Sequence, residues 1–203
     1  MNNRVCTKDY QLCGESSVRT LRDGCPVLTE SAALLKNIHE EKAYVRSVFQ
    51  SLTEDPIDTL FVDVILKKDG EEVGRIGNFR YAVGGAGRGA AFGQTVGIPL
   101  PSDKEFDEAE ILLKKAVLQD GTEKQATGET ESFPEEESLL TYFEDAELVE
   151  EYSEEAEANG IFLPTQSKAY WRCACGQINH QSEAACWLCN GEKERLFACL
   201  NAE

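Results

Sequence analysis

Ile57-Asp58-Thr59-Leu60-Phe61-Val62-Asp63-Val64-Ile65-Leu66 is the clearest secondary-structure signal in this chain of 203 residues. The even-numbered positions from Leu60 to Leu66 are all apolar, which is the two-residue period of a β-strand with one buried face. Phe61 and Ile65 lie on the opposite face with Asp63 between them, so we expect that face to be partly buried. The stretch predicts a strand within a sheet.

A hairpin and further strands are predicted around this stretch. Asp69-Gly70 is a dipeptide typical of two-residue hairpin turns, and Val73 to Tyr81 fits the return strand. Other strand-like runs are separated by turn or proline signals; they are residues 27–35, 43–50 and 122–125. Short strands at this spacing predict a mainly β fold, an antiparallel, immunoglobulin-like β-sandwich over residues 25–125.

Two segments beside these strands carry weaker signals. Residues 103–118 have the composition of a helix, but the sandwich needs a strand leading into the Asp120-Gly121 turn. We therefore predict a strand over residues 109–119. Residues 1–24 are polar and predict an irregular, extended lead-in.

An acidic segment over residues 126–168 follows. Between Glu129 and Ala158 it contains thirteen acidic residues and neither lysine nor arginine. The part up to Pro134 predicts a mobile linker. From Glu135 onward, apolar residues recur at intervals of three to five, so we expect one or two amphipathic, acidic helices.

Charge and hydropathy argue against nucleic acids and membranes as binding partners. The net charge of −17 repels nucleic-acid phosphates and anionic membrane surfaces. No apolar run approaches the roughly 18 residues of a membrane span, and the first residues lack the apolar core of a secretion signal. We expect a cytoplasmic protein with no membrane partner.

Four of the eight cysteines are spaced as metal ligands within residues 169–197. Two close pairs face each other across a ten-residue loop, and four thiolates suit the tetrahedral coordination of zinc. We predict one structural Zn²⁺ per chain, because four sulfur ligands leave no position for a catalytic water. The predicted ligands are Cys173, Cys175, Cys186 and Cys189.

The other cysteines lack this spacing. Free thiols are the favoured interpretation for Cys6, Cys13, Cys25 and Cys199, with a second metal site or a redox role as the alternative.

The cysteine pairs resemble the Ran-binding-protein type of zinc finger, a small zinc ribbon with the pattern Trp-x-Cys-(two to four)-Cys-(three)-Asn-(six)-Cys-x-x-Cys. Trp171 and Asn179 match it together with the four cysteines, although the first pair is separated by one residue only. The resemblance implies that Asn179 braces the loop between the two cysteine turns and that Trp171 packs on the module. Some such fingers bind single-stranded RNA, but the arginines used for this are missing from residues 180–183.

The larger layout resembles a group of bacterial proteins, mostly from Gram-positive anaerobes, that join a β-sandwich to a C-terminal zinc ribbon. The matching stretches are residues 26–28, 49–51, 57–64, 92–93 and 117–121. This resemblance implies an architecture without implying an activity.

No catalytic set is recognisable. His39 and His180 are the only histidines, and we expect both to be ordinary surface residues. The glycine-rich residues 84–93 lack the following helix that a phosphate-binding loop needs. We expect a non-enzymatic protein that interacts with, or serves as a scaffold for, another protein. One alternative is single-stranded RNA binding through the zinc ribbon; the second is an enzyme or ligand-binding protein that uses residues 84–93.

Overall fold

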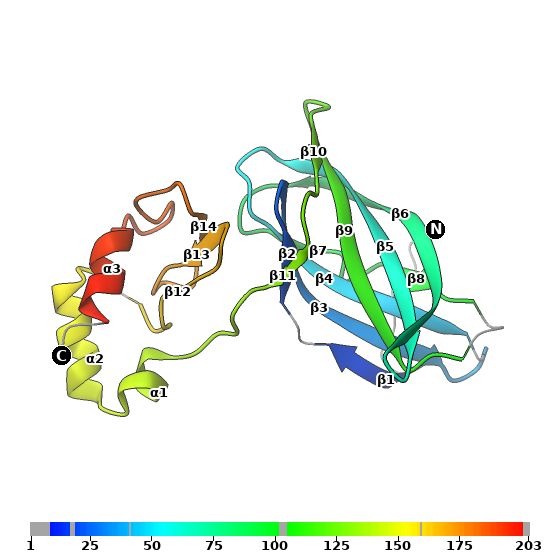
Figure 1. Ribbon diagram of the computed structural model, residues 1–203, viewed down its shortest axis with the longest axis horizontal. Helices are drawn as coiled ribbons and strands as arrows, with labels where there is room; N and C mark the ends of the chain where they lie inside the picture. Colours follow the sequence, from blue (N-terminus) through cyan, green and yellow to red (C-terminus); the bar gives the residue numbers. More distant parts are fainter. Residues whose placement is uncertain (1–8, 17–18, 41, 102–104, 159, 201–203) are drawn as a thin grey trace. The chain divides into compact units, whose positions relative to one another are not determined.

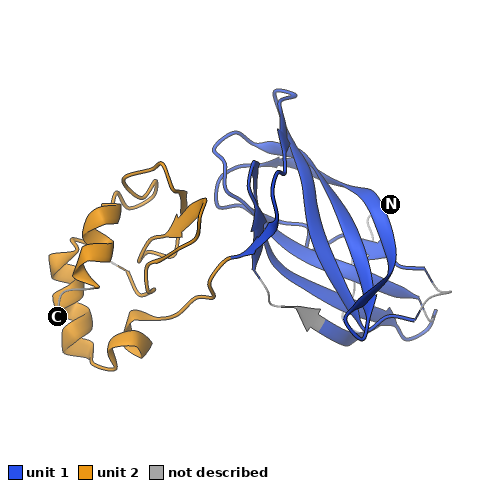
Figure 2. Cartoon of the chain, in the orientation of Figure 1, with its two compact units in different colours: residues 1–132 blue, residues 133–203 orange. Residues whose placement is uncertain are grey.

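The computed structural model describes residues 9–16, 19–40, 42–101, 105–158 and 160–200, so Cys6 lies outside the described residues. The chain divides into two compact units, residues 1–132 and 133–203 (Figure 2). Strands predominate, and the paired strands are antiparallel, so the mainly β prediction is confirmed. The strands of the first unit are β1 Tyr10–Ser16, β2 Thr20–Arg22, β3 Cys25–Asn37, β4 Ala43–Ser51, β5 Ile57–Lys68, β6 Glu71–Ala86, β7 Ala91–Phe92, β8 Gly97–Pro99, β9 Glu108–Leu118, β10 Glu123–Gln125 and β11 Thr130–Ser132.

These strands form two sheets (Figure 1). One has the order β11-β2-β3-β4-β7, with β1 also paired to β3 and β8 to β4, and the other has the order β10-β9-β5-β6. Buried side chains from both sheets make one hydrophobic core. Members from the first sheet include Val27, Ala32, Val45 and Phe49, and members from the second include Leu60, Val62, Ile111 and Leu113.

Strand β5 occupies the middle of the second sheet, between β6 and β9. The side chains of Leu60, Val62 and Val64 are fully buried, as their alternation predicts. The predicted hairpin turn is also confirmed. Asp69 and Gly70 have φ values of 51° and 84°, the two positive values that a type I′ turn requires.

Strand β9 confirms the choice of strand over helix for the segment before Asp120. Pairing with β5 places Ala109, Ile111 and Leu113 in the core. This burial outweighs the helical propensity of the glutamates and lysines of the same strand, because strand preference depends on packing context.

Two expected irregular segments form strands instead. Within residues 1–24, β1 and β2 both pair with β3, although their sequence is polar. Strand β11 pairs with β2, and Phe133 directly after it is buried, so the predicted mobile linker is wrong at this point. Backbone hydrogen bonds to neighbouring strands hold these strands in the sheet without an apolar pattern of their own.

The second unit combines three short helices with a small sheet. The acidic segment, for which one or two helices are predicted, contributes α1 and α2. Along the described parts of the chain, no helix combines the length and the apolar character needed to cross a bilayer. The elements of the unit are α1 Leu139–Phe143, α2 Ala146–Glu155, β12 Thr165–Gln166, β13 Tyr170–Arg172, β14 Ile178–His180 and α3 Lys193–Cys199.

The first prediction concerns Gly93, between β7 and β8, where φ is +91°. A Cβ atom there would lie 2.7 Å from Phe49 Cδ2 and 2.8 Å from the Ser47 carbonyl oxygen. Gly93→Ala should lower the free energy of unfolding by about 2 kcal/mol or more, because strain and overpacking add. Urea denaturation followed by circular dichroism measures this loss.

Gly121→Ala is the matched control. Gly121 has a similar φ of +86°, but a Cβ atom there meets no heavy atom within 4 Å. We expect a loss of about 1 kcal/mol from backbone strain alone. Equal losses for the two variants would contradict the packing argument at Gly93.

Candidate metal centre

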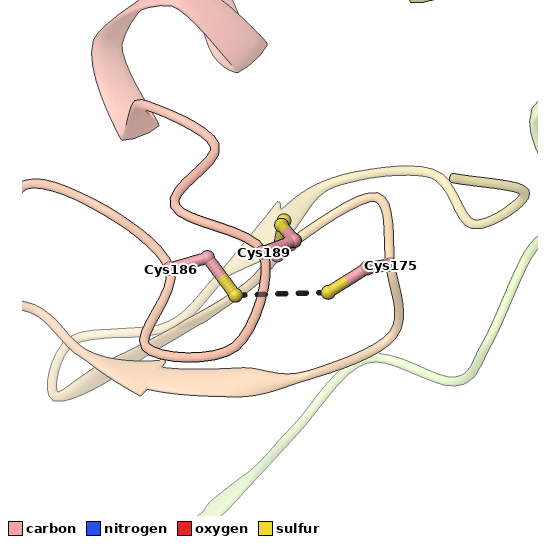
Figure 3. Close-up of side chains that lie close together, drawn as sticks. Cys175, Cys186 and Cys189 are labelled. Atoms are coloured by element: carbon pink, nitrogen blue, oxygen red, sulfur yellow. Dashed lines mark hydrogen bonds between the residues drawn. The ribbon is translucent and has the colours of Figure 1, made fainter. Parts of the chain in front are cut away.

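The four predicted cysteines come together in the second unit. Their Sγ atoms all lie within 4.8 Å of one another. The Sγ atoms of Cys173 and Cys189 are 3.5 Å apart. Those of Cys175 and Cys186, joined by the dashed line in Figure 3, are 3.6 Å apart. Four sulfur atoms bound at about 2.3 Å around a tetrahedral zinc ion lie about 3.8 Å from one another. The cluster therefore has the size needed to hold a metal ion.

Two tight turns present the sulfur atoms. In the first turn, the Gly176 N–H donates to the Cys173 carbonyl at 2.8 Å, and Gly176 has a positive φ of 89°. In the second turn, the Asn190 N–H donates to the Cys186 carbonyl at 2.9 Å, and Asn190 has a φ of 61°. Glycine and asparagine tolerate this left-handed conformation better than other residues do. The two turn conformations thus explain why a glycine follows the first cysteine pair and an asparagine follows the second.

Asn179 connects the two turns and is fully buried. Its side-chain oxygen accepts a hydrogen bond from the Trp187 N–H at 3.0 Å, and its side-chain NH₂ donates to the Gln177 carbonyl at 3.1 Å. Gln177 follows the first turn, whereas Trp187 lies within the second. Asn179 therefore has the bracing position that the zinc-finger resemblance implies.

Trp171 joins the cysteine cluster to the helices. Its indole N–H donates to the carbonyl groups of His180 and Glu183, both at 3.1 Å. The fully buried ring belongs to a hydrophobic cluster with Leu139 and Tyr152, which come from α1 and α2. Trp171 thus packs against the acidic segment as well as against the cysteine module.

Arg172 is a structural residue that the sequence does not reveal. It is fully buried, and its guanidinium donates to the Pro134 and Glu135 carbonyl oxygens at 2.8 Å each. The same group lies over the Phe133 ring, 5.0 Å from its centroid. These contacts hold residues 133–135 to the module. No local motif predicts them, because the partners are backbone groups far away in the sequence.

The electrostatics of the cluster favour a cation. A hydrogen bond from Cys173 lowers the pKa of Cys186 to about 4, and the same hydrogen bond, followed by burial, raises the pKa of Cys173. Burial raises the pKa of Cys175 to about 12. Four thiolates at these distances repel one another strongly, so their full ionisation requires a bound positive charge.

The remaining candidates lie outside the cluster. Cys25 is buried in the core of the first unit, where burial raises its pKa to about 12, as suits an unreactive thiol. Cys13 is exposed, and Cys199 is partly buried in α3. Both histidines are exposed.

The glycine-rich residues 84–93 run from the end of β6 into β7, so a strand follows them where a phosphate-binding loop would have a helix. The carboxylate of Glu54 lies 3.8 Å from the Arg88 guanidinium in this loop.

Comparison with protein-family models, curated proteins and solved structures gave no significant match to this chain.

The second prediction concerns metal content. Elemental analysis of the purified protein should find one metal ion per chain, and Cys186→Ala should reduce this to none, because three sulfur ligands and a cavity hold the ion far more weakly.

Cys13→Ala, which removes an exposed thiol of the first unit, is the control and should retain the ion. A wild-type protein that is folded and contains no metal would contradict the prediction.

Proposed function

We propose that residues 169–197 form a zinc ribbon with one structural Zn²⁺. The donor set supports zinc, since four thiolates in a closed tetrahedron are typical of structural zinc sites. The support for a structural role is that all four sulfur atoms are used and that Asn179 and Trp171 lock the surrounding turns. This ion would hold the shape of the second unit and perform no reaction.

The third prediction uses the position of the tryptophans. Trp171 and Trp187 are the only tryptophans of the chain, and both lie in the second unit. Removing zinc with a chelator should shift their fluorescence emission to longer wavelength, because small zinc modules usually unfold without metal.

Adding Zn²⁺ back should restore the emission, and Mg²⁺ should not, because it prefers oxygen ligands. Emission that stays unchanged after verified metal removal would show that the ion does not maintain the fold.

We further propose that the first unit is an antiparallel β-sandwich. The support is the single core shared by its two sheets. The immunoglobulin-like description gains no support from the strand order. In immunoglobulin domains the second and third strands lie in different sheets, whereas β2 and β3 are hydrogen-bonded neighbours.

We infer that the protein is non-enzymatic and that the second unit binds another protein through α1 and α2. Three large apolar side chains of these helices are exposed: Leu140 to 55%, Tyr142 to 47% and Leu148 to 44%. Five exposed glutamates belong to α2 together with Leu148, and they are Glu147, Glu150, Glu151, Glu154 and Glu155. Exposed apolar groups combined with charged side chains are typical of protein interaction sites. The charge indicates a basic partner.

The same charge does not favour RNA binding. The second unit contains fifteen acidic and four basic residues. Among the basic residues, Arg172 is fully buried, and Arg195 forms an ion pair with Glu157 at 2.7 Å. Binding to RNA depends on cationic groups that replace counterions at the phosphates, and acidic residues far outnumber such groups in this unit.

The fourth prediction tests the interaction. Affinity capture from the native host with the wild-type chain should enrich a basic protein, and added salt should weaken the capture. A variant with Glu150→Gln, Glu151→Gln and Glu154→Gln should capture that protein several-fold less, because the partner loses its charge complement.

A second triple variant controls for total charge. Glu71, Glu105 and Glu129 are exposed acidic residues of the first unit, and their replacement by glutamine should leave the capture unchanged. If both variants retain the same partner at wild-type levels, the acidic surface is not the binding site.

A further inference from the structure

A pocket of about 310 Å³ lies in the first unit and is lined by residues of both sheets. Strands β2, β3 and β11 of one sheet and β5 and β9 of the other contribute to its wall. Its size is at the lower end of the range of roughly 300–1,000 Å³ for small-molecule sites. The residues that line it are Thr20, Thr29, Ala32, Lys67, Glu108, Ala109, Glu110, Ile111, Thr130 and Ser132.

The pocket exists because short side chains on β3 and β9 leave part of the space between the two sheets unfilled. Ala32 of β3 and Ala109 of β9 belong to the shared core, and both line the pocket. Larger side chains fill the core elsewhere along the same strands, at Leu34 and Leu113. Strand β10 pairs only with residues 115–117 of β9, so the part of β9 that lines the pocket has no strand partner on that edge among the described residues.

Thr29 supplies the most informative polar group. Its side chain is 3% exposed, and its hydroxyl has no hydrogen-bond partner among the described residues. Thr29 pairs with the core residue Phe49 across β3 and β4, which places it on the inner face of its sheet. A buried hydroxyl without a partner is costly, so a bound molecule at this position would recover that free energy.

The other polar groups of the pocket match a hydroxyl-rich ligand. Thr20, Thr130 and Ser132 add three hydroxyls, each able to donate and to accept a hydrogen bond. Lys67 pairs with Glu110 at 2.7 Å and lies 3.9 Å from Glu108. With two carboxylates and one ammonium, the lining carries one net negative charge, which disfavours phosphate and carboxylate ligands.

We propose that this pocket binds a neutral carbohydrate of one or two sugar rings. Sugar hydroxyls both donate and accept, as the threonine and serine hydroxyls do. The carboxylates of Glu108 and Glu110 accept hydrogen bonds from further hydroxyls of the ligand, and the apolar carbon face of a ring packs on Ala32 and Ala109. This binding activity is independent of the metal centre and of the acidic surface of the second unit.

Titration calorimetry with the full chain tests the proposal. The probes are glucose, galactose, mannose, N-acetylglucosamine, cellobiose and lactose, each at up to about 10 mM, which reveals millimolar affinity. We expect saturable binding of at least one sugar. Thr29→Val should weaken that binding roughly three- to tenfold, because the isosteric side chain cannot form the hydrogen bond.

Thermal stability separates a ligand-binding hydroxyl from a structural one. Thr29→Val should leave Tm of the free protein unchanged or raise it, because it removes an unsatisfied buried group. Thr59→Val is the matched control. Thr59 is also 3% exposed, but its hydroxyl donates to Asp58 at 2.9 Å, so this change should lower Tm and preserve sugar binding. Failure of all six sugars to bind, or equal sugar affinity in Thr29→Val and the wild type, would overturn the proposal.

Discussion

The alternation of side chains along β13 is the constraint on which the second unit depends. Adjacent residues of a strand point to opposite faces, so Trp171 and Arg172 serve different sides of the module. Trp171 reaches the hydrophobic cluster of the helices, and Arg172 holds the backbone at Pro134 and Glu135. Cys173 then supplies a sulfur directly after the strand. A shift of one residue would misplace all three groups at once, so metal cluster, helices and acidic segment are folded together.

Features that depend on local sequence could be predicted. The period-two pattern of β5, the Asp69-Gly70 turn and the paired cysteines each specify their structure within a few residues. The bracing role of Asn179 comes from the resemblance to a zinc-finger pattern, in which the asparagine has a fixed spacing from the cysteines. In each case the physical cause is short in range: a steric preference for positive φ, an alternation of faces or the bite of a metal ion.

Features that depend on distant partners could not be predicted. The acidic segment looks like a linker in isolation, yet Leu139, Tyr152 and Ala156 complete the cluster around Trp171. Strands β1, β2 and β11 owe their existence to neighbouring strands rather than to their own patterns. The pocket in the first unit depends on which residues of β3 and β9 face each other, although these strands belong to different sheets; pairing with β4 positions β3, and pairing with β5 positions β9. A sequence pattern predicts which face of a strand or helix is buried better than it predicts which element packs on that face.

The acidic surface has a charge that is unusually constant. Between Lys124 and Lys168 the chain contains neither lysine, arginine nor histidine. These residues therefore include no histidine, which is the side chain that proteins commonly use as a switch near physiological pH. Enzymes that acylate lysine also have no target within residues 125–167. Ionic strength and bound counterions are thus the variables that tune the strength of its attraction.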